Sequence, residues 1–344
     1  MLFAYQYISH DLEKMHGYMD YIFYEIWIKA NILNDFDISL FDDNKELQAI
    51  FNYLYLSDNS PKYGKKFVGS VKKIFDFCKS LSWFQRRKLS YWYKVNNKIE
   101  DLCNGKYKPA LYSDLNTINK DLSNEIKSIY DNLYSQNKIG LKEISTHYTD
   151  FVKINNKGIC PFCGIYPMDG EFSDTREAYD HYLPKSKYPF TSINLKNLPP
   201  MCHKCNSGYK GVKNPIFDSS DNRRKIFYPY TDSTDIKIEV NLSSSDIQNL
   251  QHEDIDLTIS ATEQEKTDTW QELFGIDIRY RALFCGADGK AWIQQIIGEA
   301  PDFNMNSSEY LEIKKRQFEK NPYFEKNFLK ITFLEACKEN GVFN

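Results

Sequence analysis

Two pairs of cysteines stand out as residues that could bind a metal ion. The first pair is Cys160-Pro-Phe-Cys163, the second is Cys202-His-Lys-Cys205, and residues 164–201 separate them. Four thiolates complete a closed tetrahedral shell around Zn²⁺, so two C-x-x-C pairs in one chain are typical of a structural zinc site. The alternative is a thioredoxin-type redox motif, which needs a strand-to-helix context and has no use for a second pair. We therefore predict that these four cysteines bind zinc.

The other four cysteines occur singly within helical patterns, where we expect small buried side chains rather than ligands: Cys78, Cys103, Cys285 and Cys337. The first residues contain no basic region and no small-residue cleavage site, which predicts a cytoplasmic protein whose thiols stay reduced. No window of about 18 apolar residues occurs, so we expect no membrane association.

Polar side chains that suit acid–base chemistry and cation binding lie between and beside the cysteine pairs. Asp180 and His181 are adjacent, and Asn206 follows Cys205 directly. A neutral imidazole is available near pH 7 to take a proton from water. A carboxylate and an amide carbonyl offer the hard oxygen ligands that Mg²⁺ or Mn²⁺ prefers. These residue types predict a hydrolase in which His181 activates water while Asp180 and Asn206 hold the cation.

The order of these motifs resembles that of the HNH endonucleases of the ββα-metal superfamily, in the subgroup held by a four-cysteine zinc. The matching pattern is C-x-x-C, then D-H-x-x-P, then N-L-x-P-x-C-x-x-C-N-x-x-x-K-G, over about residues 158–212. The resemblance implies catalytic roles for His181, Asp180, Asn197 and Asn206. Asn197 would fix the loop of the general base by hydrogen bonds, with Asn194 as the competing candidate. Many members have a histidine at the position of Asn206, so the metal preference stays open.

Two further segments resemble stand-alone bacterial HNH proteins. They are the tyrosine-rich D-H-Y-L-P-K-S-K-Y-P sequence and the later Trp270-x-x-Leu-Phe-x-Ile-x-x-Arg279-Tyr280. Some of those proteins accompany ATPases in anti-phage systems such as Septu or retron-linked ones. The resemblance implies a DNA endonuclease of phage defence with an ATPase as partner. Two alternatives remain open, an RNA-cleaving HNH nuclease and a zinc-stapled nucleic-acid-binding module without catalysis.

Backbone geometry limits how these side chains can meet. In a regular strand Asp180 and His181 would face opposite ways, so we expect the strand to end there, before Pro184. On a helix through the second cysteine pair, Lys210 is four residues after Asn206 and emerges on the same side, where it could meet a phosphate. We expect a face that binds the phosphate backbone, lined by Lys185, Lys187, Lys204, Lys210 and Lys213 and extended by Arg223, Arg224 and Lys225.

Apolar spacing predicts what surrounds this segment. The predicted fold is mainly α with a small central α+β module, a ββα-metal (HNH) core held by zinc. The domains would be an N-terminal helical domain at 1–155, the nuclease domain at 156–230 and a C-terminal domain at 231–344. N-terminal helices are predicted at His10–Asn31, Lys45–Leu56, Gly64–Ser80, Trp83–Leu102, Leu115–Ser135 and Leu141–Ile154. A hairpin at Ile236–Leu242 and Ile255–Ile259 and helices at Glu263–Phe274, Ile276–Cys285, Lys290–Glu299, Ser307–Lys320 and Tyr323–Glu339 follow.

Net charge at first argues against nucleic-acid binding, because the 344 residues carry −3 and such domains are usually basic. The charge is unevenly distributed, however. Residues 1–150 carry +1, residues 151–230 carry +5 and residues 231–344 carry −9. The basic excess therefore coincides with the motif segment, and the acidic C-terminal region is better suited to protein contacts or to limiting non-specific binding.

Overall fold

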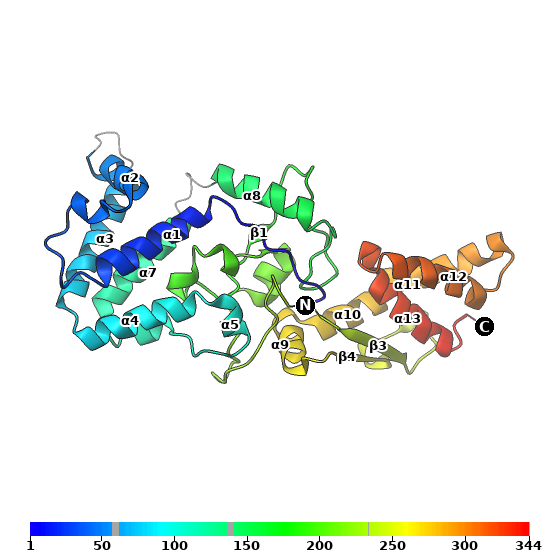
Figure 1. Ribbon diagram of the computed structural model, residues 1–344. Coiled ribbons are helices and arrows are strands. Elements are labelled where there is room, and N and C mark those ends of the chain that lie inside the picture. Colours follow the sequence, from blue (N-terminus) through cyan, green and yellow to red (C-terminus); the bar gives the residue numbers. More distant parts are fainter. Residues whose placement is uncertain (57–61, 136–140, 233, 344) are drawn as a thin grey trace.

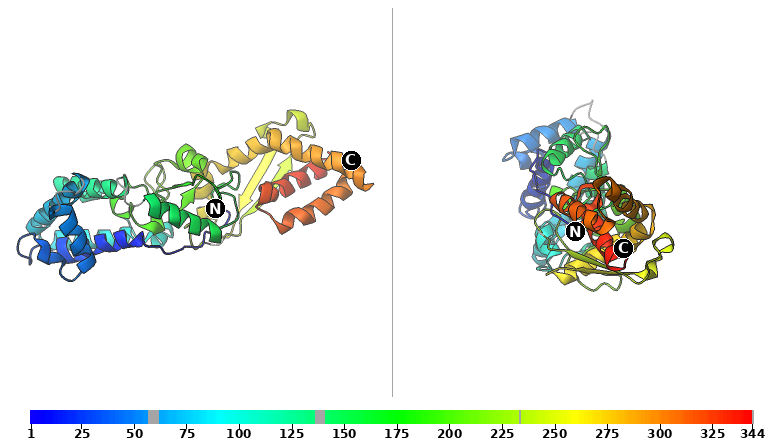
Figure 2. Two further views of the ribbon diagram at one scale, coloured as in Figure 1. Left: turned by 90° about the horizontal axis from the view of Figure 1, so that it is seen from above. Right: turned by 90° about the vertical axis from the view of Figure 1, so that its right-hand side faces the viewer.

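The computed structural model describes residues 1–56, 62–135, 141–232 and 234–343, and they form an elongated molecule (Figure 1). The N-terminal helices occupy one end, an irregular segment the middle and the C-terminal helices the other end. The chain begins near the middle of this long shape, whereas its C-terminus lies at the far end, as Figure 1 and the left view of Figure 2 both show. Among the described residues no helix has the length and apolar character needed to cross a bilayer.

Most of the predicted N-terminal helices are confirmed. They are α1 (Glu13–Tyr21), which continues as a π-helical turn over Ile22–Trp27, α2 (Lys45–Leu56), α3 (Lys62–Ser80), α4 (Trp83–Asn96), α5 (Ile99–Cys103), α6 (Tyr112–Leu115), α7 (Lys120–Ser135) and α8 (Leu141–Ile154). The helix predicted at Leu115–Ser135 begins only at Lys120, since Leu115 ends the short α6, and the helix predicted at Trp83–Leu102 is broken between α4 and α5. The side chain of Asn119 accepts a hydrogen bond from the Leu122 backbone at 2.9 Å and so caps α7. The loop predicted at 137–140 lies outside the described residues.

The central segment enters the core of the N-terminal helices. Phe190, from the turn Pro189–Thr191, lies edge-on to Tyr93 of α4, with ring centroids 5.1 Å apart. Tyr93 in turn stacks on Phe23 at 3.8 Å. Phe190 and Ile193 are buried in the same hydrophobic cluster as these helices. This shared core fixes the position of the motif segment against α4.

Two short antiparallel strands followed by a helical turn make up the regular structure of the middle region. β1 (Ala178–Tyr179) pairs with β2 (Pro200–Met201), with Ala178 opposite Met201. A π-helical turn over Lys204–Lys210 follows. β1 ends immediately before Asp180, as the sequence predicts.

The C-terminal region contains the predicted hairpin and helices. β3 (Lys237–Leu242) and β4 (Ile255–Ser260) are antiparallel, and they are followed by α9 (Gln264–Phe274), α10 (Ile276–Cys285), α11 (Ala287–Glu299), α12 (Ser307–Lys320) and α13 (Asn327–Glu339). Gly275 separates α9 from α10 with a φ of +59°, and a Cβ there would lie 2.4 Å from the Tyr209 ring. A side chain at 275 would therefore be strained by the positive φ and would require the Tyr209 ring or the turn itself to shift. The described residues are mainly helical, as predicted, and contain two small two-stranded sheets.

Candidate functional site

The four predicted cysteine ligands converge in the middle of the molecule. Their sulfur atoms all lie within 4.8 Å of one another, all four side chains are buried, and all are free thiols. The Sγ atoms of Cys163 and Cys202 are 4.0 Å apart. Tetrahedral Zn²⁺ with Zn–S bonds of ~2.3 Å separates its sulfurs by about 3.8 Å, whereas a disulfide needs ~2.05 Å. The arrangement therefore fits zinc, and among the described residues it is the one such cluster of three or more potential ligands.

Backbone amides turn toward the first cysteine pair. Gly164 has a φ of +63°, and its N–H donates to the Cys160 carbonyl at 2.7 Å. The Ile165 N–H donates to Cys163 Sγ at 3.4 Å. A Cβ at Gly164 would lie 2.3 Å from Leu2, so the tight approach of the N-terminal segment also requires glycine.

Arg279 is a site residue whose contact with the cysteines sequence reasoning did not find. Its Nη1 donates to Cys205 Sγ at 3.4 Å and to the Phe274 carbonyl at 3.1 Å, and its guanidinium lies 4.5 Å from the Tyr209 ring centroid. The side chain is buried. Four thiolates around Zn²⁺ carry a net charge of −2, so a buried guanidinium beside them supplies the countercharge. The sequence motif at 270–280 includes Arg279, but it does not indicate that this side chain contacts Cys205.

The other residues of the 270–280 motif pack over the first cysteine pair. The Trp270 indole N–H donates to the Phe162 carbonyl at 2.8 Å, and the Tyr280 hydroxyl donates to the Cys163 carbonyl at 2.9 Å. Phe274 packs on Phe162 with ring centroids 5.2 Å apart. These contacts give a physical reason for the two motifs to occur together, because α9 and α10 satisfy backbone groups that the turn around the cysteines leaves buried.

His181 is held in one tautomer just after β1. Its Nε2 lies 3.0 Å from the Ser192 carbonyl, and because a carbonyl only accepts, Nε2 carries the proton and Nδ1 carries the lone pair. Burial lowers the pKa of His181 to about 3; the Ser192 carbonyl opposes this shift, whereas the charges of Lys185 and Lys210 add to it. The imidazole is therefore neutral at pH 7.

Asn197 braces the loop that starts beside His181. Its Oδ1 accepts from the Leu183 N–H at 2.7 Å, and its Nδ2 donates to the Leu183 carbonyl and to Thr191 Oγ1, both at 3.0 Å. The side chain is fully buried. Asn194 instead bonds to Asn97 at 3.1 Å, outside the loop. Asn197 thus joins both sides of the loop, whereas the Asn194 side chain, which also accepts from the Lys196 N–H at 3.0 Å, caps only the short turn beside it.

The prediction that Lys210 faces a phosphate is wrong. Lys210 is only 1% exposed, and its Nζ lies 2.8 and 3.1 Å from the two carboxylate oxygens of Asp180. It also donates to the His181 carbonyl at 2.8 Å. The reason is that Asp180 is itself buried, and a carboxylate out of water needs a countercharge. Burial raises the pKa of Asp180, and the ammonium of Lys210 opposes that shift.

The other predicted phosphate-binding lysines lie nearer the surface. Lys187, Lys204 and Lys213 are exposed, and Lys185 is half-buried with Nζ 3.5 Å from Asp131. Asn206 is half-buried, and its backbone N–H donates to the Cys202 carbonyl at 2.9 Å. Three tyrosines of the motif segment, Tyr179, Tyr182 and Tyr188, are buried.

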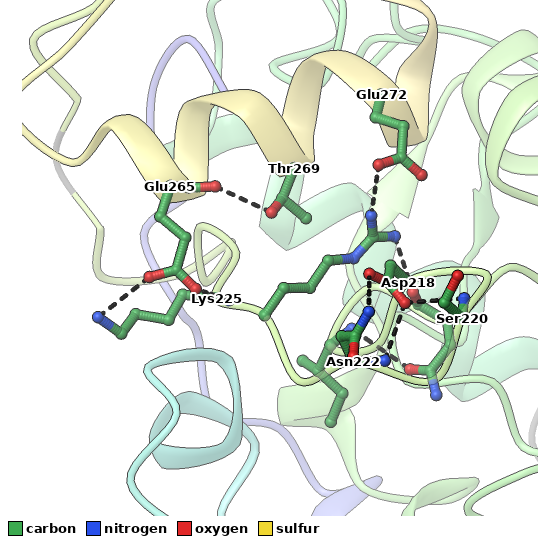
Figure 3. Close-up of polar contacts among 10 residues, drawn as sticks. Asp218, Ser220, Asn222, Lys225, Glu265, Thr269 and Glu272 are labelled. Atoms are coloured by element: carbon green, nitrogen blue, oxygen red, sulfur yellow. Dashed lines mark hydrogen bonds and ion pairs between the residues drawn. The ribbon is translucent and has the colours of Figure 1, made fainter.

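The basic run at 223–225 binds the acidic C-terminal region rather than extending a phosphate-binding face. Arg224 donates to Glu272 at 2.7 Å, and the Lys225 ammonium lies 3.2 Å from Glu265, both on α9 (Figure 3). Arg223 donates to the backbone carbonyls of Ile216 and Leu102. Backbone carbonyls hold Arg223 and Glu272 holds Arg224, so these two guanidinium groups are already used within the protein, whereas the side chain of Lys225 remains 45% exposed.

Comparison with known proteins gives two partial likenesses. The chain is 31% identical over 111 residues to Protein ea31 of Escherichia phage lambda, covering 32% of this chain and 34% of that protein. It is 36% identical over 66 residues to Septu protein PtuB of Bacillus thuringiensis, covering 17% of this chain and 25% of that protein. The chain thus spans about a third and a quarter of these relatives. No family model and no solved structure matches.

Zinc content tests the metal centre. We expect about one zinc per chain by elemental analysis, and its loss in Cys160→Ser because three thiolates leave the shell open. Cys285→Ser, which changes a half-buried cysteine outside the cluster, is the matched control and should retain zinc. A Cys160–Cys163 disulfide in a zinc-free protein would refute the assignment.

Arg279→Gln should make zinc easier to remove. The substitution keeps a donor of similar size but deletes the countercharge, and the loss of an outer-shell partner typically costs 10–100-fold in metal affinity. The measurement is zinc release to a chromogenic chelator. Arg281→Gln, on the same helix but bonded to Asp277, is the control, and equal release from both variants would contradict the role of Arg279.

The buried Asp180–Lys210 pair should matter for folding. We expect Asp180→Ala to lower the free energy of unfolding by about 3–5 kcal/mol, because it leaves an ammonium buried without a partner. The double variant Asp180→Ala/Lys210→Met removes both charges and should be more stable than Asp180→Ala alone. Urea unfolding measures both, and Glu312→Ala, from the half-exposed pair with Lys338, should cost no more than about 1 kcal/mol.

Proposed function

We propose that the protein is a metal-dependent HNH endonuclease that hydrolyses DNA phosphodiester bonds, with His181 as general base. The observation that carries the proposal is the orientation of His181. Its proton is directed to the Ser192 carbonyl at 3.0 Å, on a loop that Asn197 braces and directly after Asp180. A binding module without catalysis has no need of an imidazole held in this way.

His181 can accept a proton only at Nδ1, because Nε2 is committed to Ser192. Its pKa of about 3 in the free protein is low for a general base. The cause is burial, and an anionic phosphate bound beside the ring would favour the imidazolium and raise that pKa. His181 would therefore be neutral in the free protein, and its pKa would rise when substrate binds. Fixing the ring in advance also avoids reorganisation during the reaction.

A divalent cation would need oxygen ligands from two elements, the segment after β1 and the turn over Lys204–Lys210. Asp180 and Asn206 would hold Mg²⁺ or Mn²⁺ through a carboxylate and an amide oxygen. Oδ2 of Asp180 receives no well-directed hydrogen bond although Nζ of Lys210 lies 2.8 Å away, so it retains lone pairs for a cation. When bound, the cation would act as a Lewis acid toward the scissile phosphate and its leaving oxygen. The buried cysteines would hold the structural zinc.

A role in defence against phage, together with a partner ATPase, is part of the proposal. The partial likeness to Septu protein PtuB supports it. So does the resemblance of the cysteine, D-H and 270–280 motifs to stand-alone HNH proteins of such systems. The acidic C-terminal region is the part of the chain that we assign to protein contacts, since its charge disfavours a phosphate backbone.

A second candidate function is a zinc-stapled nucleic-acid-binding module without catalysis. The observation that favours it is the Asp180–Lys210 pair, because an ammonium already neutralises the carboxylate that the cation would use. In that case Lys210 has only a structural role. Cleavage assays separate the two candidates.

Supercoiled DNA, linear DNA, single-stranded DNA and RNA should be incubated with the full chain and Mg²⁺ or Mn²⁺. We expect cleavage of DNA, and a loss of at least about 100-fold in His181→Ala, because general-base catalysis contributes about 10²–10⁴-fold. His203→Ala, which changes an exposed histidine of the same motif, should cut normally. Zinc content and urea unfolding show that each variant is folded.

Undiminished DNA cleavage by His181→Ala would show that His181 is not the general base. Cleavage of RNA but not DNA would show that the protein is a ribonuclease of the same chemistry. Binding of nucleic acid with no cleavage by the parent chain, alone or with its partner ATPase, would favour the non-catalytic module.

A further inference from the structure

One face of α4 combines exposed aromatic rings with positive charge. Trp83 is 55% exposed, Phe84 78% and Tyr91 54%. Residues 77–99, which include α4, contain six lysines and arginines and no acidic residue. Large apolar side chains at such exposure, interleaved with cations, indicate a surface that contacts something other than water.

The charged residues gather around an open depression beside α4. It has a volume of about 380 Å³ and lies between α4 and the end of the first helical segment. Four cations line it, Lys29, Arg86, Arg87 and Lys94, and none of its lining residues is acidic. The guanidinium of Arg87 lies 4.6 Å from the Trp83 ring centroid, so cation and ring already share one surface.

The opposite face of α4 connects this surface rigidly to the His181 loop. Leu89 and Tyr93 are buried, and Tyr93 packs edge-on against Phe190. Phe190 stands two residues before Ser192, whose carbonyl holds His181. A ligand on the exposed face of α4 would therefore be fixed relative to the site of the proposed chemistry.

We propose that Trp83, Arg86, Arg87, Tyr91 and Lys94, hereafter the α4 face, bind a single-stranded segment of DNA. The cations would contact the phosphates, and Trp83 and Tyr91 would stack on bases. A single strand offers base faces to such rings, whereas a duplex hides them in its stack. A protein partner fits less well, because the core of a protein interface is depleted in charge. The choice of DNA rests on the proposed function.

Binding of a fluorescent 20-nucleotide oligo(dT), measured by anisotropy, tests this proposal. The full chain carries His181→Ala, and the buffer contains no Mg²⁺ or Mn²⁺, so cleavage plays no part. Trp83→Ala and Tyr91→Ala should each weaken binding about fivefold or more, because one lost stacking contact has an effect of that order. Arg87→Gln should lower the slope of log affinity against log salt by about 0.7. Phe324→Ala, at a ring 65% exposed in the acidic region, should bind as the parent does.

Several outcomes would overturn the proposal. They are unchanged affinity in both aromatic variants, tighter binding of a 20-base-pair duplex, or tighter binding of oligo(rU) that the same variants weaken. A purified protein partner that Trp83→Ala releases, without any oligonucleotide binding by the parent, would reassign the face to protein contacts. Because only binding is measured, failure of the nuclease leaves this inference standing. If Trp83→Ala, Tyr91→Ala and Arg87→Gln all bind normally while cleavage depends on His181, the α4 face is rejected as a binding site and the nuclease proposal is retained.

Discussion

The convergence of four cysteine sulfurs within 4.8 Å is the constraint on which the middle of the molecule depends. The strands beside it, β1 and β2, have two residues each, and so short a pair has little stability of its own. Bringing Cys163 to Cys202 closes the intervening 38 residues into a loop whose ends are fixed. That loop carries Asp180, His181 and Asn197. A zinc ion on these sulfurs would therefore fix the two ends of the loop, whose apolar side chains pack into cores shared with the helices on either side.

The C-terminal region is joined to this centre by charge as well as by packing. Its α9 and α10 satisfy the carbonyls of Phe162 and Cys163, and Arg279 brings a positive charge to Cys205. Acidic residues of α9 bind the basic run that follows the second cysteine pair (Figure 3). Some of the positive charges of the central segment therefore pair with negative charges of the C-terminal region inside the same chain. The central segment then presents less net positive charge to a ligand than the count of its residues suggests.

Features that depend on residues close in sequence were predictable, and features that depend on distant partners were not. The C-x-x-C pairs and the hairpin at 237–260 follow from local spacing, and the structure contains both. The burial of Lys210 depends on a carboxylate 30 residues earlier, and the contact of Arg279 depends on a sulfur 74 residues earlier. Helical spacing predicted an exposed position for Lys210. Such spacing shows which residues share a face of a helix, but it does not show that a buried carboxylate lies opposite that face.

Lys210 also connects the two halves of the candidate site. It ends the helical turn that Cys205 anchors, and its single ammonium bonds to both the Asp180 carboxylate and the His181 carbonyl. Loss of the metal from the cysteines would therefore loosen more than the cysteine cluster. The turn would lose its anchor, the ammonium would shift, and a buried carboxylate would be left without its countercharge beside the imidazole. Because a carboxylate buried in this way is costly unless paired, the geometry of His181 is coupled to the four sulfurs through Lys210. The cysteine cluster thus does more than hold the fold together, since it also positions the polar groups of the candidate site.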